Sequence, residues 1–177
     1  MRILLIGGSK SGKSHFAQTL CLQLAKNRSL YYWAAMEPTD EEDHVRIARH
    51  LCDRDGMGFR TIECGRKLNN VLPSLLPEGT ILFDSITALL ANEMFGDSID
   101  AHAPQRVLQE LLTVSQHCAH FLCVCDDIWR DGTSYSALTQ QYCRGLAQIC
   151  RALASEFDTV CEISAGIPFC RKGELPL

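Results

Sequence analysis

Eight consecutive residues near the start of the chain match a phosphate-binding pattern at each fixed position. They fit the Walker A pattern G-x-x-x-x-G-K-[ST] and are Gly7, Gly8, Ser9, Lys10, Ser11, Gly12, Lys13 and Ser14. Glycines let the backbone curl so that its N–H groups point at phosphate oxygens, and the start of a following helix attracts the same charge. Lys13 would then neutralise the β- and γ-phosphates as a catalytic residue, and Ser14 would bind Mg²⁺. The motif predicts a nucleoside triphosphate site.

The segments on either side of this motif support the prediction. An apolar run, Ile3–Ile6, precedes it, and the mostly helical pattern of His15–Ala25 follows it without a proline. The alternative is a glycine-rich turn that binds nothing, and this strand-loop-helix context disfavours it. We expect a buried strand to lead into the phosphate loop and a helix to leave it.

A second candidate magnesium ligand ends another apolar run. Thr80–Asp84 is typical of a buried strand that ends in an acid, as a Walker B strand does, so Asp84 could hold Mg²⁺ directly or through water. Asp84 or Ser85 could equally cap the helix that follows, and the two roles are compatible. We predict that Ser14 and Asp84 form the metal site.

One histidine stands out on a predicted helix from about Asp40 to Asp53. Thr39 and Glu42 have the spacing of a capping box at its start. A helical wheel places His44 on the apolar face with Ile47, Ala48 and Leu51, and His50 on the opposite face with Arg46. From this segment alone His50 is either a presented functional group or a solvated helix residue, and the second interpretation is favoured.

The remaining segments alternate between strands and helices. Strands are predicted over residues 29–34, 59–63, 121–125 and 159–164, the last being the final strand, and helices over 66–76, 103–118 and 137–156. Such alternation predicts an α/β fold, a mainly parallel sheet with helices on both faces. The strand that ends at Ala34 should open near the phosphate loop, so that Ala34, Ala35 and Met36 line the site. At 177 residues the chain suits one domain over 1–177.

Composition restricts the class of ligand. The formal net charge of −4 and the dispersed lysines and arginines argue against nucleic-acid binding, so a small phosphorylated ligand is expected. No apolar run approaches the roughly 20 residues that a membrane span needs.

Ten cysteines are scattered along the chain, and several lie in apolar strand-like runs where a thiol packs as a small hydrophobe. We interpret them as reduced and the protein as cytoplasmic. A metal cluster of histidines and cysteines between His117 and Cys125 is conceivable, but the strand and helix-end placement of its members and the lack of a C-x-x-C pair disfavour it.

Taken together, these motifs resemble the adenosylcobinamide kinase/adenosylcobinamide-phosphate guanylyltransferase family of cobalamin biosynthesis, a P-loop fold related to RecA. Gly7–Ser14 resembles its GGxxSGKS loop, and Arg46–His50 its RIxxH motif after an acidic run. Thr61–Glu63 is similar to a TxE element, Asp84–Thr87 to a D-C-L-T segment, and Ser164–Pro168 to an SGIP ending with one residue added.

The resemblance implies a P-loop nucleotide-binding transferase domain with two activities. It would phosphorylate adenosylcobinamide with ATP or GTP, and it would transfer GMP from GTP to adenosylcobinamide phosphate through His50, the nucleophile, which holds GMP as a phosphoramidate. By the same resemblance the guanine nucleotide contacts Ala34, Ala35, Met36, Leu51, Cys52, Asp53, Arg54, Glu63 and Asp84. The resemblance also implies a homo-oligomer, a trimer.

One segment departs from the family pattern. The family's N-E-V-G-x-G-I-V-P loop stands here as Asp126–Ser134, with Trp129, Asp131 and Ser134 at the positions of its two glycines and its proline. Nucleotide binding should tolerate this change better than acceptor specificity. The alternatives are therefore a P-loop small-molecule kinase with another acceptor and a nucleotide-binding module without catalysis.

Overall fold

The computed structural model describes residues 1–96, 98–129 and 132–176, without the side chain of Arg46. Seven strands form one sheet in the order β3-β2-β4-β5-β1-β6-β7. The strands are β1 (Arg2–Gly7), β2 (Leu30–Ala34), β3 (Arg60–Glu63), β4 (Thr80–Asp84), β5 (His120–Asp126), β6 (Thr159–Ser164) and β7 (Ile167–Lys172). The helices are α1 (Lys13–Ala25), α2 (Glu41–Asp53), α3 (Ile86–Met94), α4 (Ala103–His117) and α5 (Ala137–Glu156), with short 3₁₀ turns η1 (Leu68–Asn70) and η2 (Leu72–Ser74).

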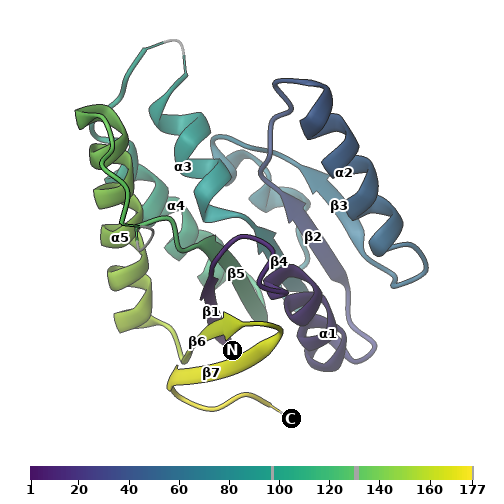
Figure 1. The fold of residues 1–177 in the computed structure, drawn as a ribbon. Helices are drawn as coiled ribbons and strands as arrows, with labels where there is room; N and C mark the ends of the chain where they lie inside the picture. Colours follow the sequence, from purple (N-terminus) through teal and green to yellow (C-terminus); the bar gives the residue numbers. More distant parts are fainter. Residues whose placement is uncertain (97, 130–131, 177) are drawn as a thin grey trace.

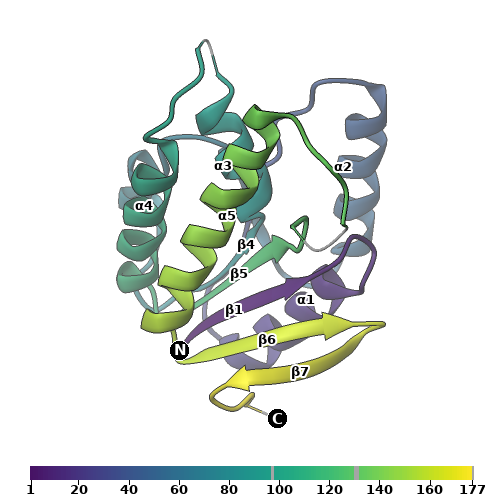
Figure 2. The same ribbon diagram turned by 60° about the vertical axis from the view of Figure 1, so that its left-hand side comes forward.

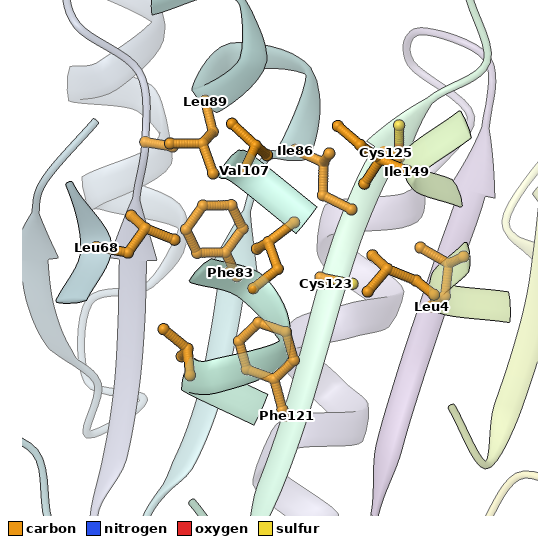
Figure 3. Close-up of a cluster of buried hydrophobic side chains, with 14 of the residues drawn as sticks. Leu4, Leu68, Phe83, Ile86, Leu89, Val107, Phe121, Cys123, Cys125 and Ile149 are labelled. Atoms are coloured by element: carbon orange, nitrogen blue, oxygen red, sulfur yellow. The ribbon is translucent and has the colours of Figure 1, made fainter. Parts of the chain in front are cut away.

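Helices cover both faces of the sheet, as predicted (Figure 1). Alternate strand residues point to opposite faces, so Leu4 packs with α3, α4 and α5 while its neighbours Ile3 and Leu5 pack with α1. On the first face Phe83 and Phe121 lie at the centre of a buried cluster (Figure 3). Two separate apolar layers therefore hold the sheet rigid beneath the strand ends.

The six strands from β1 to β6 run parallel to one another. Strand β5 lies between β1, which leads into the phosphate loop, and β4, which ends at Asp84. All carboxyl ends of these strands consequently meet along one edge of the sheet, where ligands of open α/β sheets bind.

The predicted helix over residues 66–76 is wrong. Only the two 3₁₀ turns η1 and η2 form there, with Pro73 inside η2 and Lys67 in the left-handed region at φ 50°. Proline lacks the N–H that an α-helix needs and disfavours helical backbone in the preceding residue. The segment 66–76 has apolar residues at helical spacing, but Pro73 in its interior prevents a continuous α-helix.

The last strand of the chain is β7 rather than β6. It pairs antiparallel with β6 at the edge of the sheet, where Figure 2 shows the hairpin beside β1. Ala165 and Gly166 connect the strands with φ of 51° and 78°, the two positive values that a tight hairpin turn requires. Pro168 is tolerated because β7 is an edge strand. The SGIP-like segment is thus a hairpin turn.

Helix α2 presents a different face from the one predicted. His44 and Leu51 are exposed, whereas Ile47 and His50 lie three residues apart on the side that lines a cavity. The start of α2 also differs by one residue, because Asp40 is the cap and its carboxylate accepts the Asp43 N–H at 2.9 Å. Ile47 and His50 line this cavity together with Tyr32 and Ala34 of β2, so the position of the helix against this strand, and not the spacing of apolar residues along the helix, decides which face of α2 turns inward.

Candidate active site at the carboxyl ends of the strands

The phosphate loop is shaped by backbone contacts on both sides. Gly12 has φ 90°, and the Ser11 N–H donates to the Gly8 carbonyl at 3.2 Å. From the hairpin, the Gly166 N–H donates to the Ser11 carbonyl at 2.8 Å. The Ser11 hydroxyl is buried without a hydrogen-bond partner among the described residues. It is therefore free to donate a hydrogen bond to a ligand in the loop.

Lys13 begins α1 and lies under the loop, 5 % exposed. Its Nζ donates to the Gly8 carbonyl at 2.7 Å and forms an ion pair with Asp126 Oδ1 at 2.9 Å. Asp126 ends β5 directly beside Gly7 in β1. The predicted phosphate-binding ammonium therefore has an internal carboxylate partner.

Ser14 and Asp84, the two predicted metal ligands, lie together. The Ser14 hydroxyl donates to Asp84 Oδ2 at 3.0 Å, and the Tyr32 hydroxyl donates to the same oxygen at 2.7 Å. Burial and the Asp84 charge raise the pKa of Tyr32, so the phenol stays a donor. A hydroxyl and a carboxylate at a cavity wall are the hard oxygen ligands that Mg²⁺ prefers, and the pair fits this ion. Ser85, and not Asp84, caps α3 through the Ala88 N–H.

Arg54 is buried next to this pair, at the end of α2. Its guanidinium carbon lies 3.4 Å from the centroid of the Tyr32 ring, and the residue is 6 % exposed. Nε and Nη1 have no hydrogen-bond partner within the described ranges. Burying a cation whose N–H donors have no partner costs folding free energy unless an acceptor forms hydrogen bonds with them. Arg54 is therefore well suited to a phosphate or a base carbonyl.

His50 faces the same cavity one helical turn before Arg54. The half-buried imidazole makes no hydrogen bond or ion pair in the described part of the chain. A cavity of about 780 Å³ joins it to the phosphate loop, to Asp84 and to Asp126. A smaller cavity of about 60 Å³ adjoins it between α2 and β2. The His50 imidazole and the predicted phosphate loop thus line one cavity.

The predicted site residues divide into two groups. Those that line the two cavities are Ser9, Lys10, Ser11, Gly12, Lys13, Ser14, Ala34, Met36, His50, Asp53, Arg54 and Asp84. The linings do not include Gly7, Gly8, Ala35, Leu51, Cys52 and Glu63. Among these, Gly8 bonds Lys13, Ala35 is fully buried in the core, and Leu51, Cys52 and Glu63 are exposed. Their contacts with nucleotide stay predictions.

Sequence reasoning missed several residues of the site. Tyr32 contacts Asp84, and Asp126 contacts Lys13. The lining of the larger cavity also includes residues of α3 and α5, namely Thr87, Ala88, Ala91 and Tyr142. The Tyr142 hydroxyl donates to the Thr87 carbonyl at 2.7 Å, which joins α5 to α3. Asp126 carries a detectable signal, an acid at the end of a buried strand, but the predicted strand 121–125 stops one residue short of it and leaves it in the loop Asp126–Ser134. Arg130 and Asp131 of that loop lie outside the described residues.

The cysteines of the segment His117–Cys125, which spans the end of α4 and most of β5, pack in the core. Cys123 and Cys125 are buried in the cluster of Figure 3. Burial raises the pKa of the Cys123 thiol, and the hydrogen bond with Cys150, together with burial, raises the pKa of the Cys125 thiol. No group of three or more metal-ligating side chains occurs in the described part of the chain. Among the helices described, none has the length and apolar character needed to cross a bilayer.

Comparison with known proteins places this site in a family context. The model of the family described as cobinamide kinase / cobinamide phosphate guanyltransferase matches residues 3–170. The bifunctional adenosylcobalamin biosynthesis protein CobU of Salmonella typhimurium is 27% identical over 180 residues, covering 94% of this chain and 97% of the relative. The protein CobP of Pseudomonas aeruginosa, with the same descriptive name, is 28% identical over 179 residues, covering 98% and 99%.

A solved structure resembles the fold. The flagellar accessory protein FlaH from Methanocaldococcus jannaschii superimposes with a TM-score of 0.56 at 16% identity, covering 98% of this chain and 78% of that one. At this identity the likeness concerns the fold alone. The predicted class, an α/β P-loop fold of RecA type with a mainly parallel sheet, is confirmed.

Proposed function

The chain belongs to the cobinamide kinase / cobinamide phosphate guanyltransferase family, and we propose that it carries out both reactions in cobalamin biosynthesis. It phosphorylates adenosylcobinamide with ATP or GTP, and it transfers GMP from GTP to adenosylcobinamide phosphate. The observation that carries this proposal is the single cavity shared by His50, the phosphate loop and Asp84. A kinase alone would need no free imidazole beside its phosphate cradle.

In the kinase reaction, the phosphate loop and Lys13 orient the triphosphate. A hydroxyl of the corrinoid attacks the γ-phosphorus in line, the bond from that phosphorus to the β,γ-bridging oxygen breaks, and the nucleoside diphosphate leaves. Mg²⁺ held by Ser14 and Asp84 would supply charge neutralisation on the phosphates. Catalysis here consists of positioning and electrostatic stabilisation by residues that the sheet holds rigid.

In the guanylylation reaction, His50 is the nucleophile. The neutral imidazole nitrogen bonds to the α-phosphorus of GTP and pyrophosphate leaves, which produces a phosphoramidate with GMP. A phosphate oxygen of adenosylcobinamide phosphate then attacks the same phosphorus and the imidazole leaves. Arg54, four residues after His50, has the free donors to hold an oxygen of the transferred group.

The decisive experiment uses GTP labelled at the α-phosphate. Wild-type protein with Mg²⁺ should retain acid-labile label after denaturation, and His50→Ala should retain none. His44→Ala is the matched control, because His44 lies exposed on the same helix outside both cavities. Equal labelling of His50→Ala and wild type would contradict the assignment of the nucleophile.

A kinase with another acceptor is the second candidate. This candidate is favoured by the ion pair of Lys13 with Asp126. Asp126 is the first residue of the loop Asp126–Ser134, and the family motif has asparagine at that position. In that case wild type would take no α-label yet transfer γ-phosphate. A nucleotide-binding module without catalysis would bind GTP and transfer neither group.

We further propose a cytoplasmic location and a homo-oligomer, a trimer by resemblance. The ten cysteines, all free thiols in the structure, support a reducing compartment. Light scattering of the purified protein at several concentrations measures the assembly, and a mass three times that of the chain is expected.

A further inference from the structure

The β6–β7 hairpin places two cysteines opposite each other. Cys161 and Cys170 are register partners in the antiparallel pair, and their Sγ atoms lie 2.8 Å apart. Cys161 is fully buried and Cys170 is exposed. We propose that these thiols form a reversible disulfide, a modification site separate from the nucleotide cavity.

The backbone already satisfies the geometry of a disulfide. Directly opposed residues of antiparallel strands have Cα atoms about 4.5 or 5.5 Å apart. A disulfide needs a Cα separation of about 4.4–6.8 Å, so the pairing of Cys161 with Cys170, next to the register shift between Val160 and Cys161, suits a bridge. Side-chain rotation alone would bring the two sulfurs to bonding distance.

Accessibility separates this pair from the other neighbouring thiols. Cys125 and Cys150 also interact, but both are buried, at 0% and 4% exposure, so an oxidant reaches neither. In the hairpin, by contrast, Cys170 is an exposed residue, and the sulfur of its buried partner lies 2.8 Å from its own. Burial raises the pKa of Cys161 to about 12, which keeps that thiol protonated and makes Cys170 the first to react.

Hydrogen peroxide is the class of oxidant that this arrangement suits. Peroxide converts the Cys170 thiol to a sulfenic acid and water. The Cys161 sulfur then bonds to the Cys170 sulfur, the S–O bond breaks, and the hydroxide leaves as a second water with the Cys161 proton. Two thiols lose two electrons and peroxide gains them. A dithiol reductant reverses the bridge.

The bridge would stabilise a structure that supports the phosphate loop. The ring closed by Cys161 and Cys170 contains Gly166, whose N–H donates to the Ser11 carbonyl at 2.8 Å. A cross-link restricts the unfolded chain more than the folded one. We expect the oxidised protein to melt about 5 °C higher than the reduced protein.

The test is peroxide treatment of the purified protein, denaturation, alkylation of remaining thiols and mass spectrometry of the peptides. Wild type should lose alkylation at Cys161 and Cys170 together and yield one peptide pair linked through them, which dithiothreitol separates. Cys170→Ser, a change at an exposed position, should leave Cys161 fully alkylated. Cys52→Ser removes the other exposed cysteine and should yield the same Cys161–Cys170 linked peptide pair as wild type.

Two results would overturn the proposal. One is a Cys161 that remains alkylated after oxidation of wild type while Cys170 accumulates as sulfinic acid. The other is a bridge from Cys170 to a second copy of the chain. Both are read on wild-type protein, so they do not depend on the folding of a variant, and neither bears on the transferase activities.

Discussion

The Lys13 ammonium lies 2.9 Å from the Asp126 carboxylate, and this ion pair joins the phosphate loop to the end of β5. Lys13 is almost wholly buried, whereas the Asp126 side chain is 35% exposed at the cavity wall. A bound triphosphate would place its own negative charge beside that carboxylate. The Asp126 carboxylate therefore holds Lys13 in position and at the same time repels the negative charge of the ligand.

We predict that Asp126→Asn tightens triphosphate binding. The amide keeps the size of the side chain and removes the negative charge that competes with phosphate for Lys13. We expect about a tenfold lower Kd, about 1.4 kcal/mol, for a non-hydrolysable GTP analogue in calorimetry. Asp100→Asn, which alters an acid paired with Arg106, is the control. Unchanged or weaker binding would show that Asp126 chiefly holds Lys13 in place.

Tyr32→Phe should weaken Mg²⁺ binding. The variant removes the hydroxyl that donates to Asp84 Oδ2 at 2.7 Å and keeps the ring beneath Arg54. Groups that orient a metal ligand typically contribute about 10- to 100-fold in affinity or activity. A Mg²⁺ titration of nucleotide binding should shift by at least about tenfold. Tyr31→Phe is the matched control, because the Tyr31 hydroxyl accepts the Leu76 N–H and does not contact Asp84. An equal shift of the Mg²⁺ titration in Tyr31→Phe would refute the role of Tyr32.

Gly12→Ala should destabilise the fold at the phosphate loop. Gly12 has φ 90°, and a Cβ there would lie 3.1 Å from Gly166 Cα. Left-handed backbone costs an L-residue about 1–2 kcal/mol, and the hairpin would have to shift as well. Urea denaturation should show a loss of about 1–3 kcal/mol in the free energy of unfolding. Gly8→Ala, whose Cβ would meet no atom within 4 Å, should change stability little by comparison.

Glu110→Gln should raise stability at neutral pH. Glu110 is 7 % exposed and accepts the Leu68 N–H at 3.2 Å, and burial raises the pKa of its carboxyl. A carboxyl with a raised native pKa binds protons more tightly when folded, so stability falls as pH rises from the unfolded pKa of about 4.3 through the native pKa. Glutamine keeps an acceptor without a charge.

The measurement for this variant is the urea midpoint across pH 4–8. The advantage of Glu110→Gln should be largest at pH 7–8 and should shrink toward pH 4, where the wild-type carboxyl is protonated. Exposed Glu156→Gln provides the control. A variant that is less stable than wild type at pH 7 would contradict the prediction.

Sequence by itself determined the local features of this protein. The phosphate loop, the buried strands β1 and β4 and the full extent of α5 follow from patterns within short segments, namely apolar runs, glycine positions and caps. Strand and helix alternation likewise indicated a mainly parallel sheet. These features are encoded by neighbours in the chain, so one segment at a time is enough to predict them.

Tertiary structure alone decided which groups meet. Asp126 reaches Lys13 because β5 pairs with β1, and Tyr32 reaches Asp84 because β2 pairs with β4. The inward face of α2 depends in the same way on β2, with which the helix shares a cavity, and β7 exists because it can pair with β6 at the edge of the sheet. Such contacts join residues far apart in sequence through strand order, and no local periodicity specifies strand order.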